Sequence, residues 1–148
     1  MQDKPVHPRD RRLQRSLGYA LVRAFRQVNR ASNRALRRHG LSAEQAHLLL
    51  VLWLEGPMKM GELQRLLMLS SGTLTGAIDR MERAGLVRRS PDPDDGRAWR
   101  VEPTGADGKS RRAIEGSLEG IEADCFRALT AAERADLLRL LDKISSSL

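Results

Sequence analysis

The first forty residues carry hydrophobic side chains at heptad spacing. Six of them follow one another at alternating intervals of four and three residues, the period of a helix stripe that packs against another helix: Leu17, Leu21, Ala24, Val28, Ala31 and Ala35. Arginines occupy the other faces, and Gly40 is a suitable residue to end a helix. The pattern predicts one helix over about residues 9–38. Its stripe needs a partner helix, either within the subunit or, the interpretation we favour, in a second subunit.

Three further helices are predicted in close succession. A Ser-x-x-Gln capping box opens a helix over about 42–54. A short helix over about 60–67 follows a Gly-Pro pair, and Ser70 or Ser71 opens another that ends at Arg83. Two consecutive helices joined by a short turn are typical of a helix-turn-helix.

Residues 86–103 change to the pattern of a β-hairpin. Leu86–Arg89 is predicted as a strand, the segment 91–97 is dense in turn-forming residues, and Arg97–Glu102 is predicted as the returning strand. The middle of the chain is therefore expected to be a compact module of helices followed by a hairpin.

The C-terminal segment predicts two more amphipathic helices. The first runs from Thr104 to about Ala128, and a capping box of Thr130 and Glu133 opens the second. Their apolar stripes consist of Ile114, Leu118, Ile121 and Cys125 on the first helix and of Leu137, Leu141, Ile144 and Leu148 on the second. We expect a mainly α fold with six helices and a small β-hairpin.

The predicted helix at 71–83 has two contrasting faces. Its apolar stripe spans about 100° of a wheel drawn at 100° per residue and consists of Leu74, Ala77, Ile78 and Met81. The other side carries small and polar residues: Gly72, Thr73, Thr75, Gly76, Asp79, Arg80 and Arg83. A glycine inside a helix costs roughly 1 kcal/mol relative to alanine, so two of them favour a face that approaches a phosphate backbone or groove wall closely. The alternative is drift on a solvated face.

The positive charge of the chain is unevenly distributed. The chain has 148 residues and a formal net charge of +7. Residues 1–40 hold eleven basic and two acidic residues, residues 41–103 hold eight and nine, and residues 104–148 hold seven and eight. A polyanionic partner is the usual reason for such an excess. Here the excess lies on the N-terminal segment, where it either adds phosphate contacts or only solvates the helix.

The sequence carries no pattern of an enzyme or of a metal site. It has no nucleophile elbow and no Gly-rich phosphate loop. His7, His39, His47 and Cys125 do not have metal-ligand spacing, and Cys125 is expected to be structural. No run of about 18 apolar residues and no signal-type stretch is present. We therefore expect no enzyme activity, no cofactor, no metal, no membrane contact and a cytoplasmic location.

Taken together, these residues resemble the winged helix-turn-helix regulators of the MarR family. The similarity covers about 65 residues, from LSAEQ at 41–45 through 56–101. Asp95-x-Arg97 with Thr104 further on is similar to the wing signature of that family, and the flanking amphipathic helices fit its dimerisation region. The resemblance implies dimerisation helices in 1–40 and 104–148 around a DNA-binding module in 41–103.

The resemblance also implies a homodimer that binds a near-palindromic DNA operator, more often as a repressor than as an activator. The helix at 71–83 would enter the major groove, and the hairpin, or wing, would reach a flanking minor groove. Contacts with bases or phosphates are implied for Ser71, Thr73 and Thr75, a minor-groove contact for Arg97, and an ion pair with that arginine for Asp95. The helical wheel and the hairpin sequence add the candidates Gly76, Arg80, Arg88 and Arg89.

The wing departs from the family pattern at Gly96 and Pro103, where a basic residue and a leucine are common, so its tip is less basic than usual. Trp99 lies on the same side of its strand as Arg97 and Val101. Trp99 either stacks on DNA or, the interpretation we favour, packs the hairpin against the module.

The resemblance further implies a small effector, often an aromatic anion in this family, at the junction of the reading module and the dimer helices. His47 and Trp53 are candidates to line that site, although Trp53 is favoured as a core residue. The effector would change the spacing of the two recognition helices, which must be about 34 Å apart to fit successive major grooves. The alternative is a winged-helix architectural or protein-interaction module without effector response.

Overall fold

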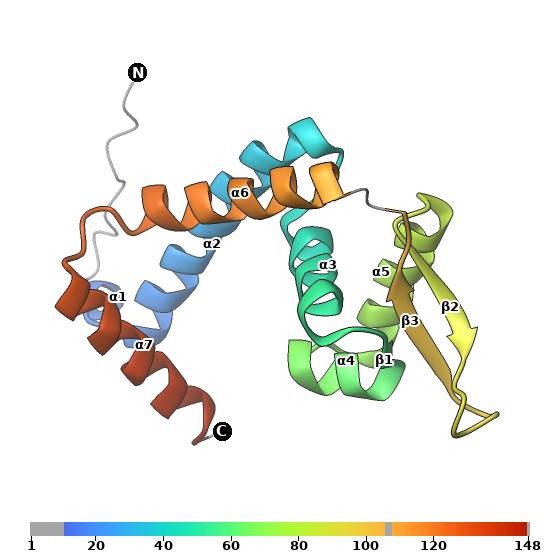
Figure 1. Ribbon diagram of the computed structural model, residues 1–148. Coiled ribbons are helices and arrows are strands. Elements are labelled where there is room, and N and C mark those ends of the chain that lie inside the picture. Colours follow the sequence, from blue (N-terminus) through green and yellow to red (C-terminus); the bar gives the residue numbers. More distant parts are fainter. Residues whose placement is uncertain (1–10, 106–107, 148) are drawn as a thin grey trace.

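The structure is a computed structural model and describes residues 11–105 and 108–147. Figure 1 shows α1, α2, α6 and α7 at one end of the molecule and α3, α4 and α5 with a small sheet at the other. The elements are α1 (Arg11–Gln14), α2 (Leu17–Leu36), η1 (Arg37–His39), α3 (Ala43–Glu55), β1 (Met58–Lys59), α4 (Met60–Leu67), α5 (Ser71–Arg83), β2 (Val87–Pro91), β3 (Trp99–Pro103), α6 (Gly108–Cys125) and α7 (Ala131–Ser145). The mainly α fold with a small β wing is confirmed.

The N-terminal stripe does not form one continuous helix. α1 ends at Gln14, and Ser16 is extended (φ −78°, ψ 115°), with its hydroxyl accepting a hydrogen bond from the Tyr19 N–H at 3.2 Å. A serine that caps a new helix start competes with continuation of the old helix. The expected single helix over 9–38 is therefore divided, and the described residues contain seven α-helices instead of six.

Both predicted capping boxes are present. The Ser42 hydroxyl accepts from the Gln45 N–H at 3.2 Å, and the Gln45 side chain accepts from the Ser42 N–H at 2.9 Å. Thr130 and Glu133 form the same reciprocal pair at 3.3 and 2.8 Å. Gly40 ends the first helical segment with φ +68°, a left-handed conformation that favours glycine.

The sheet has three antiparallel strands in the order β1-β3-β2. β2 and β3 form the predicted hairpin, with Val87 opposite Pro103. β1 was not expected, because a strand of two residues, Met58–Lys59, is too short to show an alternating pattern. It pairs with Arg100 and Val101 of β3 and so attaches the hairpin to the helical module.

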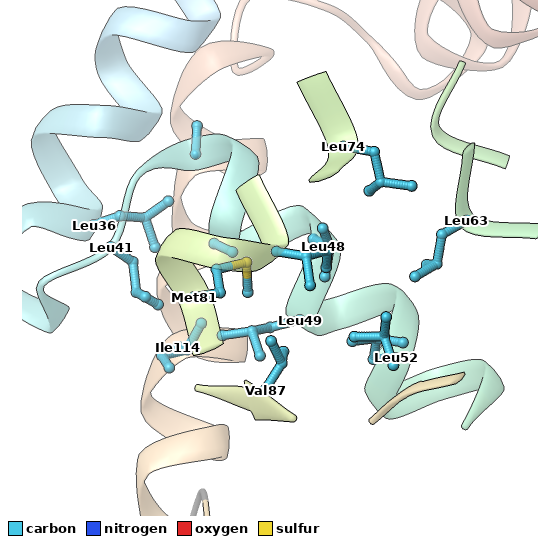
Figure 2. Close-up of a cluster of buried hydrophobic side chains, with 14 residues drawn as sticks. Leu36, Leu41, Leu48, Leu49, Leu52, Leu63, Leu74, Met81, Val87 and Ile114 are labelled. Carbon is cyan, nitrogen blue, oxygen red and sulfur yellow. The ribbon is translucent and has the colours of Figure 1, made fainter. Parts of the chain in front are cut away.

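α3 lies at the centre of the hydrophobic core. Its Leu48, Leu49 and Leu52 are at most 2% exposed and meet side chains from the surrounding helices and strands (Figure 2). Full burial of a leucine contributes about 1.5–3 kcal/mol, so this cluster fixes where α5 and the hairpin stand. Its other members are Leu36, Leu41, Ala43, Ala46, Leu63, Leu74, Ile78, Met81, Val87, Val101 and Ile114.

Thr104 closes the hairpin and does not start the next helix. Its hydroxyl donates to the Gly85 carbonyl at 2.5 Å, and its N–H donates to the Leu86 carbonyl at 3.0 Å. α6 begins at Gly108, later than expected, and ends at Cys125. Residues 106 and 107 lie outside the described residues.

α2 and α7 leave large apolar side chains on the surface of the subunit. Leu17 is 85% exposed, Phe25 66% and Leu138 63%. Within the described ranges, no helix combines the length and the apolar character needed to cross a membrane.

Candidate nucleic-acid interface

α5 has a buried base and an exposed polar face, as its sequence predicts. The base is at most 1% exposed and consists of Leu74, Ala77, Ile78 and Met81. The opposite side is exposed at Ser71, Gly72, Thr73, Thr75, Asp79, Arg80 and Arg83, with Gly76 half-buried. The helix is thus held by its apolar side and presents hydroxyls, glycines and arginines outward.

Ser70 sets the start of this face. Its hydroxyl accepts from the Thr73 N–H at 3.2 Å and lies 2.7 Å from the Thr73 hydroxyl. The cap therefore orients Thr73. Within the described part of the chain, no hydrogen bond engages the side-chain hydroxyls of Ser71 and Thr75, which are available to a ligand.

Gly76 lies next to the guanidinium of Arg80. A β-carbon at position 76 would lie 3.4 Å from a terminal nitrogen of the Arg80 guanidinium, so this guanidinium lies back along the helix. At Gly72 the same atom would meet nothing within 4 Å. An alanine β-carbon would therefore fit at both positions, in van der Waals contact with Arg80 at position 76 and in open space at position 72.

Arg89 joins the hairpin to α5. Its guanidinium pairs with Asp79 at 2.6 Å and with Glu82 at 2.5 Å, and its N–H donates to Glu82 at 2.9 Å. The backbone hydrogen bond and the charge of Arg89 lower the pKa of Glu82. Burial lowers the pKa of Arg89, but its bonds to Asp79 and Glu82 outweigh burial and raise it. Arg89, a candidate for DNA contact, thus lies in an ion-pair network inside the protein.

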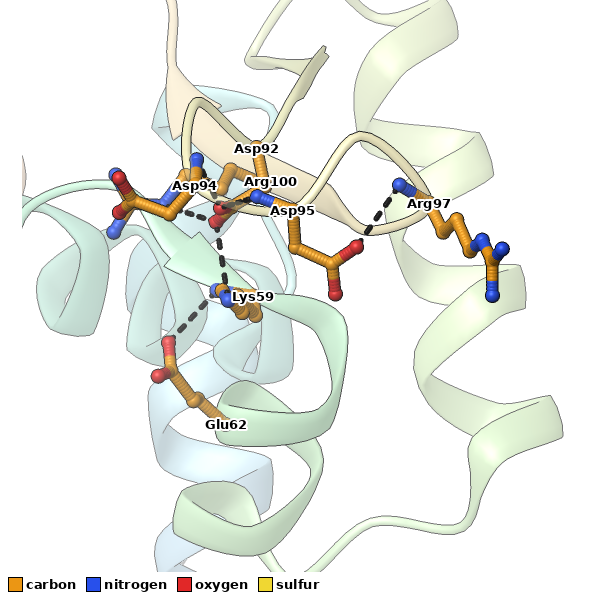
Figure 3. A network of polar contacts seen from close by, with 7 residues as sticks. All are labelled: Lys59, Glu62, Asp92, Asp94, Asp95, Arg97 and Arg100. Atoms are coloured by element: carbon orange, nitrogen blue, oxygen red, sulfur yellow. Dashed lines mark hydrogen bonds and ion pairs between the residues drawn. The ribbon is translucent and has the colours of Figure 1, made fainter.

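Asp92 holds the turn of the wing from within. It is 3% exposed, accepts from the backbone N–H groups of Asp94 (2.9 Å) and Asp95 (3.0 Å), and pairs with Lys59 (3.5 Å) and Arg100 (3.1 Å) (Figure 3). Burial raises the pKa of Asp92, but these hydrogen bonds and positive charges outweigh burial and hold it below its usual value.

The wing network reaches into α4 as well. The Lys59 N–H donates to the Glu62 carboxylate at 2.9 Å, so the residue that pairs with Asp92 also caps that helix. Lys59 therefore contacts both the buried carboxylate of Asp92 in the wing and the start of α4, the first helix of the helix-turn-helix.

Arg97 extends away from this network into solvent (Figure 3). The expected ion pair between Asp95 and Arg97 is not formed. Asp95 accepts from the Arg97 backbone N–H at 3.1 Å instead, because the turn uses the carboxylate to fix the chain direction. In the described residues the Arg97 guanidinium forms no ion pair, which leaves it available to an external anion.

Two other hairpin residues, Arg88 and Trp99, are exposed. Arg88 lies opposite Glu102 in the ladder and pairs with it at 2.8 Å, and this bond lowers the pKa of Glu102. Trp99 is 53% exposed, so the favoured interpretation that it packs the hairpin against the module is wrong. Val101, two residues further along β3, is fully buried in the core, whereas Trp99 is not.

His47 and Trp53 line two different cavities on α3. Trp53 is half-buried beside a cavity of about 620 Å³ between α3, the turn that follows α5 and the start of α6, together with His39 and Lys109. The Arg111 guanidinium lies 5.4 Å from the Trp53 ring centre. His47 lines a cavity of about 530 Å³ between α2, α3 and the residues before α5, together with Phe25.

Sequence reasoning missed Asp92 and Lys59. The segment 91–97 is rich in turn formers, where solvation is the simpler interpretation of an acidic residue. The spacing could have indicated the role of Asp92. In a turn, an aspartate side chain can accept hydrogen bonds from backbone N–H groups shortly after it, here those of Asp94 and Asp95. Its charge partners come from β1 and β3, and the pairing of those strands was not predicted.

Comparison with known proteins finds relatives among DNA-binding regulators. The family model described as MarR family matches residues 41–99. The regulator MgrA of Staphylococcus aureus is 29% identical over 133 residues, which are 89% of each chain. These matches support a MarR-family winged-helix regulator. An uncharacterized regulator of Bacillus subtilis, YkoM, is 37% identical over 77 residues, which span 52% of this chain and 50% of that protein.

Solved MarR-family structures share the architecture over most of the chain. A mutant MarR of E. coli complexed with operator DNA has a TM-score of 0.80 and 26% identity, covering 86% of this chain and 92% of that one. BpsR of Bordetella bronchiseptica, whose DNA binding is regulated by 6-hydroxynicotinic acid, has a TM-score of 0.79 and 26% identity, covering 96% and 98%. The region matched by the MarR-family model contains all of α5 and the wing turn.

Proposed function

We propose that this MarR-family chain is a homodimeric, sequence-specific DNA-binding regulator that represses transcription until a small effector releases it. The observation that carries the proposal is the exposed polar face of α5 on a fully buried base, beside the solvent-facing Arg97 of the wing. The E. coli relative bound to operator DNA supports it.

The site residues divide into those that touch DNA and those that position them. Ser71, Thr73, Thr75, Gly76 and Arg80 form the surface that enters the major groove, and Arg97 reaches the minor groove. An arginine side chain gains there from the enhanced negative potential of a narrow groove. Arg88 and Arg89, each paired with a carboxylate, and Asp95 within the wing turn position these residues.

The second subunit covers the apolar surfaces of α2 and α7. Leu17, Phe25 and Leu138 are at least 63% exposed in one subunit, and side chains of this size gain about 1.5–3 kcal/mol each when fully buried. A dimer across these helices carries two copies of α5, which fits a near-palindromic site. Sedimentation equilibrium tests this step, and a monomer at micromolar concentration would contradict it.

The effector is a small aromatic anion bound in the cavity that Trp53 lines. Trp53 offers a ring face, and His39 and Lys109 offer polar groups in the same cavity of about 620 Å³. The size fits small-ligand sites. Because this cavity borders both α3 and α6, its occupant bears on the module and on the dimer helices together.

The DNA proposal is tested with the duplex upstream of the gene against a random duplex of equal length. We expect a preference of roughly 10³-fold or more. Thr75→Ala and Arg97→Ala are each expected to weaken upstream binding about tenfold, with the dimer intact, while Arg127→Ala, exposed outside the interface, serves as the matched control. Equal affinity for both duplexes would indicate an architectural protein, and no duplex binding would indicate a protein-interaction module.

The effector proposal is tested by fluorescence. In Trp99→Phe, Trp53 is the remaining tryptophan, and we expect 6-hydroxynicotinic acid or benzoate to quench it and to release the upstream duplex. Lys109→Ala should weaken this response, whereas His47→Ala, in the other cavity, should not. If only His47→Ala loses the response, the effector binds in the second cavity, which His47 lines.

A further inference from the structure

The exposed side of α2 carries a straight row of arginines. Drawn at 100° per residue, its members fall within about 80° of arc and are Arg23, Arg26, Arg30, Arg34 and, in the following turn, Arg37. We call these five the arginine row. Its centre lies opposite the buried side of the helix, where Ser32 is 4% exposed and Leu36 is fully buried.

The row has no carboxylate to neutralise it. Residues 11–43 contain nine arginines and neither aspartate nor glutamate. Four members of the row are exposed, and Arg23 is half-buried with its guanidinium 5.9 Å from the Tyr19 ring centre. No ion pair among the described residues involves the row. Four exposed positive charges and the half-buried one of Arg23 therefore follow one another along about 21 Å of helix.

The reading module itself does not supply this charge. Residues 41–103 hold eight basic and nine acidic residues, a net charge of −1, and Arg88 and Arg89 are engaged in ion pairs. Most of the free energy of non-specific DNA binding comes from cations that neutralise phosphates and release counterions. A module of net charge −1 needs that contribution from elsewhere in the chain.

We propose that the arginine row is a second DNA-binding surface, which contacts the phosphates of a duplex without reading its sequence. The inference rests on the proposed function, because the duplex is the same ligand. The arginine row is nevertheless a separate surface from that of α5, because α3 lies between α2 and α5 in Figure 1. The members recur every three or four residues, about 4.5–6 Å along the axis. A regular line of guanidiniums suits a phosphate backbone, with which arginine forms paired hydrogen bonds.

The test measures how binding to a random-sequence duplex depends on salt. The row variant is Arg26→Gln, Arg30→Gln and Arg34→Gln combined, because glutamine keeps helix propensity close to that of arginine. The slope of log affinity against log salt should become shallower by about 0.9 for each phosphate that is no longer neutralised, hence by about 2.7 for one row. Replacing the same three residues by lysine should restore most of the slope.

A charge-matched control separates the row from net charge. Arg112→Gln, Arg127→Gln and Lys143→Gln combined also lower the net charge of the chain from +7 to +4, and should leave the slope nearly unchanged. An equal decrease of slope in both triple variants, or none in the row variant, overturns the proposal. So does a row variant that dissociates into monomers in sedimentation, because the row would then be part of the contact with a second copy.

Variants of the two proposed DNA surfaces are expected to change binding in different ways. Removal of the row should weaken binding of the upstream and random duplexes by the same factor, so that the preference between them survives. If Thr75→Ala and Arg97→Ala leave that preference unchanged while the row variant lowers the salt slope, the proposed reading surface is wrong and the row stands.

Discussion

α2 and α5 are both helices with one side packed and one side in solvent, yet their exposed sides differ in chemistry. α2 presents charge at regular intervals, with no carboxylate between Arg11 and Ala43. α5 presents hydroxyls and glycines together with Arg80 and Arg83, and its Asp79 already pairs with Arg89. Charge attracts any phosphate backbone, whereas short polar groups discriminate only at contact distance. On the two proposals above, non-specific affinity comes mainly from α2 and specificity from α5.

The largest break in this comparison is expected from the packed side of α5. Leu74→Ala removes a side chain that is 1% exposed and should cost about 2–5 kcal/mol of unfolding free energy. Phe25→Ala, its counterpart on α2, changes a side chain that is 66% exposed and should cost far less in the isolated subunit. Denaturant titration, at a concentration where both variants have the same oligomeric state, measures the two free energies of unfolding. Equal decreases in the two variants would contradict the expected difference.

The wing anchor should produce the next largest effect. Asp92→Asn removes the negative charge that faces Lys59 and Arg100, and we expect the Tm to fall by about 5 °C and binding of the upstream duplex to weaken. Asp94→Asn, at an exposed position of the same turn, is the control.

The pH dependence of the same variant has a definite sign. Because the folded-state pKa of Asp92 lies below its usual value, its contribution is complete above the unfolded pKa of about 3.9. It is lost as the pH falls through the folded-state pKa. The Tm difference between Asp92→Asn and the wild type should therefore be largest near neutrality and shrink below about pH 4. A difference that grows in acid would contradict the assignment.

The two serine caps sharpen the comparison on a smaller scale. Ser16→Ala and Ser70→Ala should each cost about 1 kcal/mol, since each hydroxyl caps the start of its helix. Only Ser70→Ala should also reduce the preference for the upstream duplex, because Ser70 orients Thr73. Thermal unfolding combined with competition binding checks both parts, and a reduced preference in Ser16→Ala would blur the separation of the helices.

The smallest effect on stability is expected at the glycines of α5. Gly72→Ala and Gly76→Ala should each stabilise the helix by up to about 1 kcal/mol. Gly76→Ala should weaken upstream binding only slightly, because its β-carbon would make an ordinary van der Waals contact, at 3.4 Å, with the flexible end of Arg80, whereas that of Gly72→Ala meets nothing within 4 Å. Identical binding by both variants would show that close approach of the helix backbone, and not the position of Arg80, is what matters.

The sequence predicts those parts of the fold that depend on local pattern. The stripe of Leu74 and Ile78, the capping box at Ser42 and the hairpin at 86–103 all follow from periodicity and turn chemistry over a few residues. The division of the first helix at Ser16 was missed, because a serine within a heptad pattern is compatible with either outcome.

The candidate site was predictable to a lesser degree, since its positioning contacts link distant segments. Asp92 meets Lys59 and Arg100 only after β1 has paired with β3. Likewise His47 and Trp53 share one helix, and only the packing of α2 and α6 on either side of it places them in separate cavities.

Arg89 ties the hairpin to α5, and Lys59 with Asp92 ties it to the start of α4. These contacts link the wing to both helices of the helix-turn-helix. A compound that lifts such a protein from its operator then has little to gain by bending the wing or unwinding the reading helix. Under the proposed function we therefore expect an effector to act by rotating α4, α5 and the wing together about their contacts with α2 and α6.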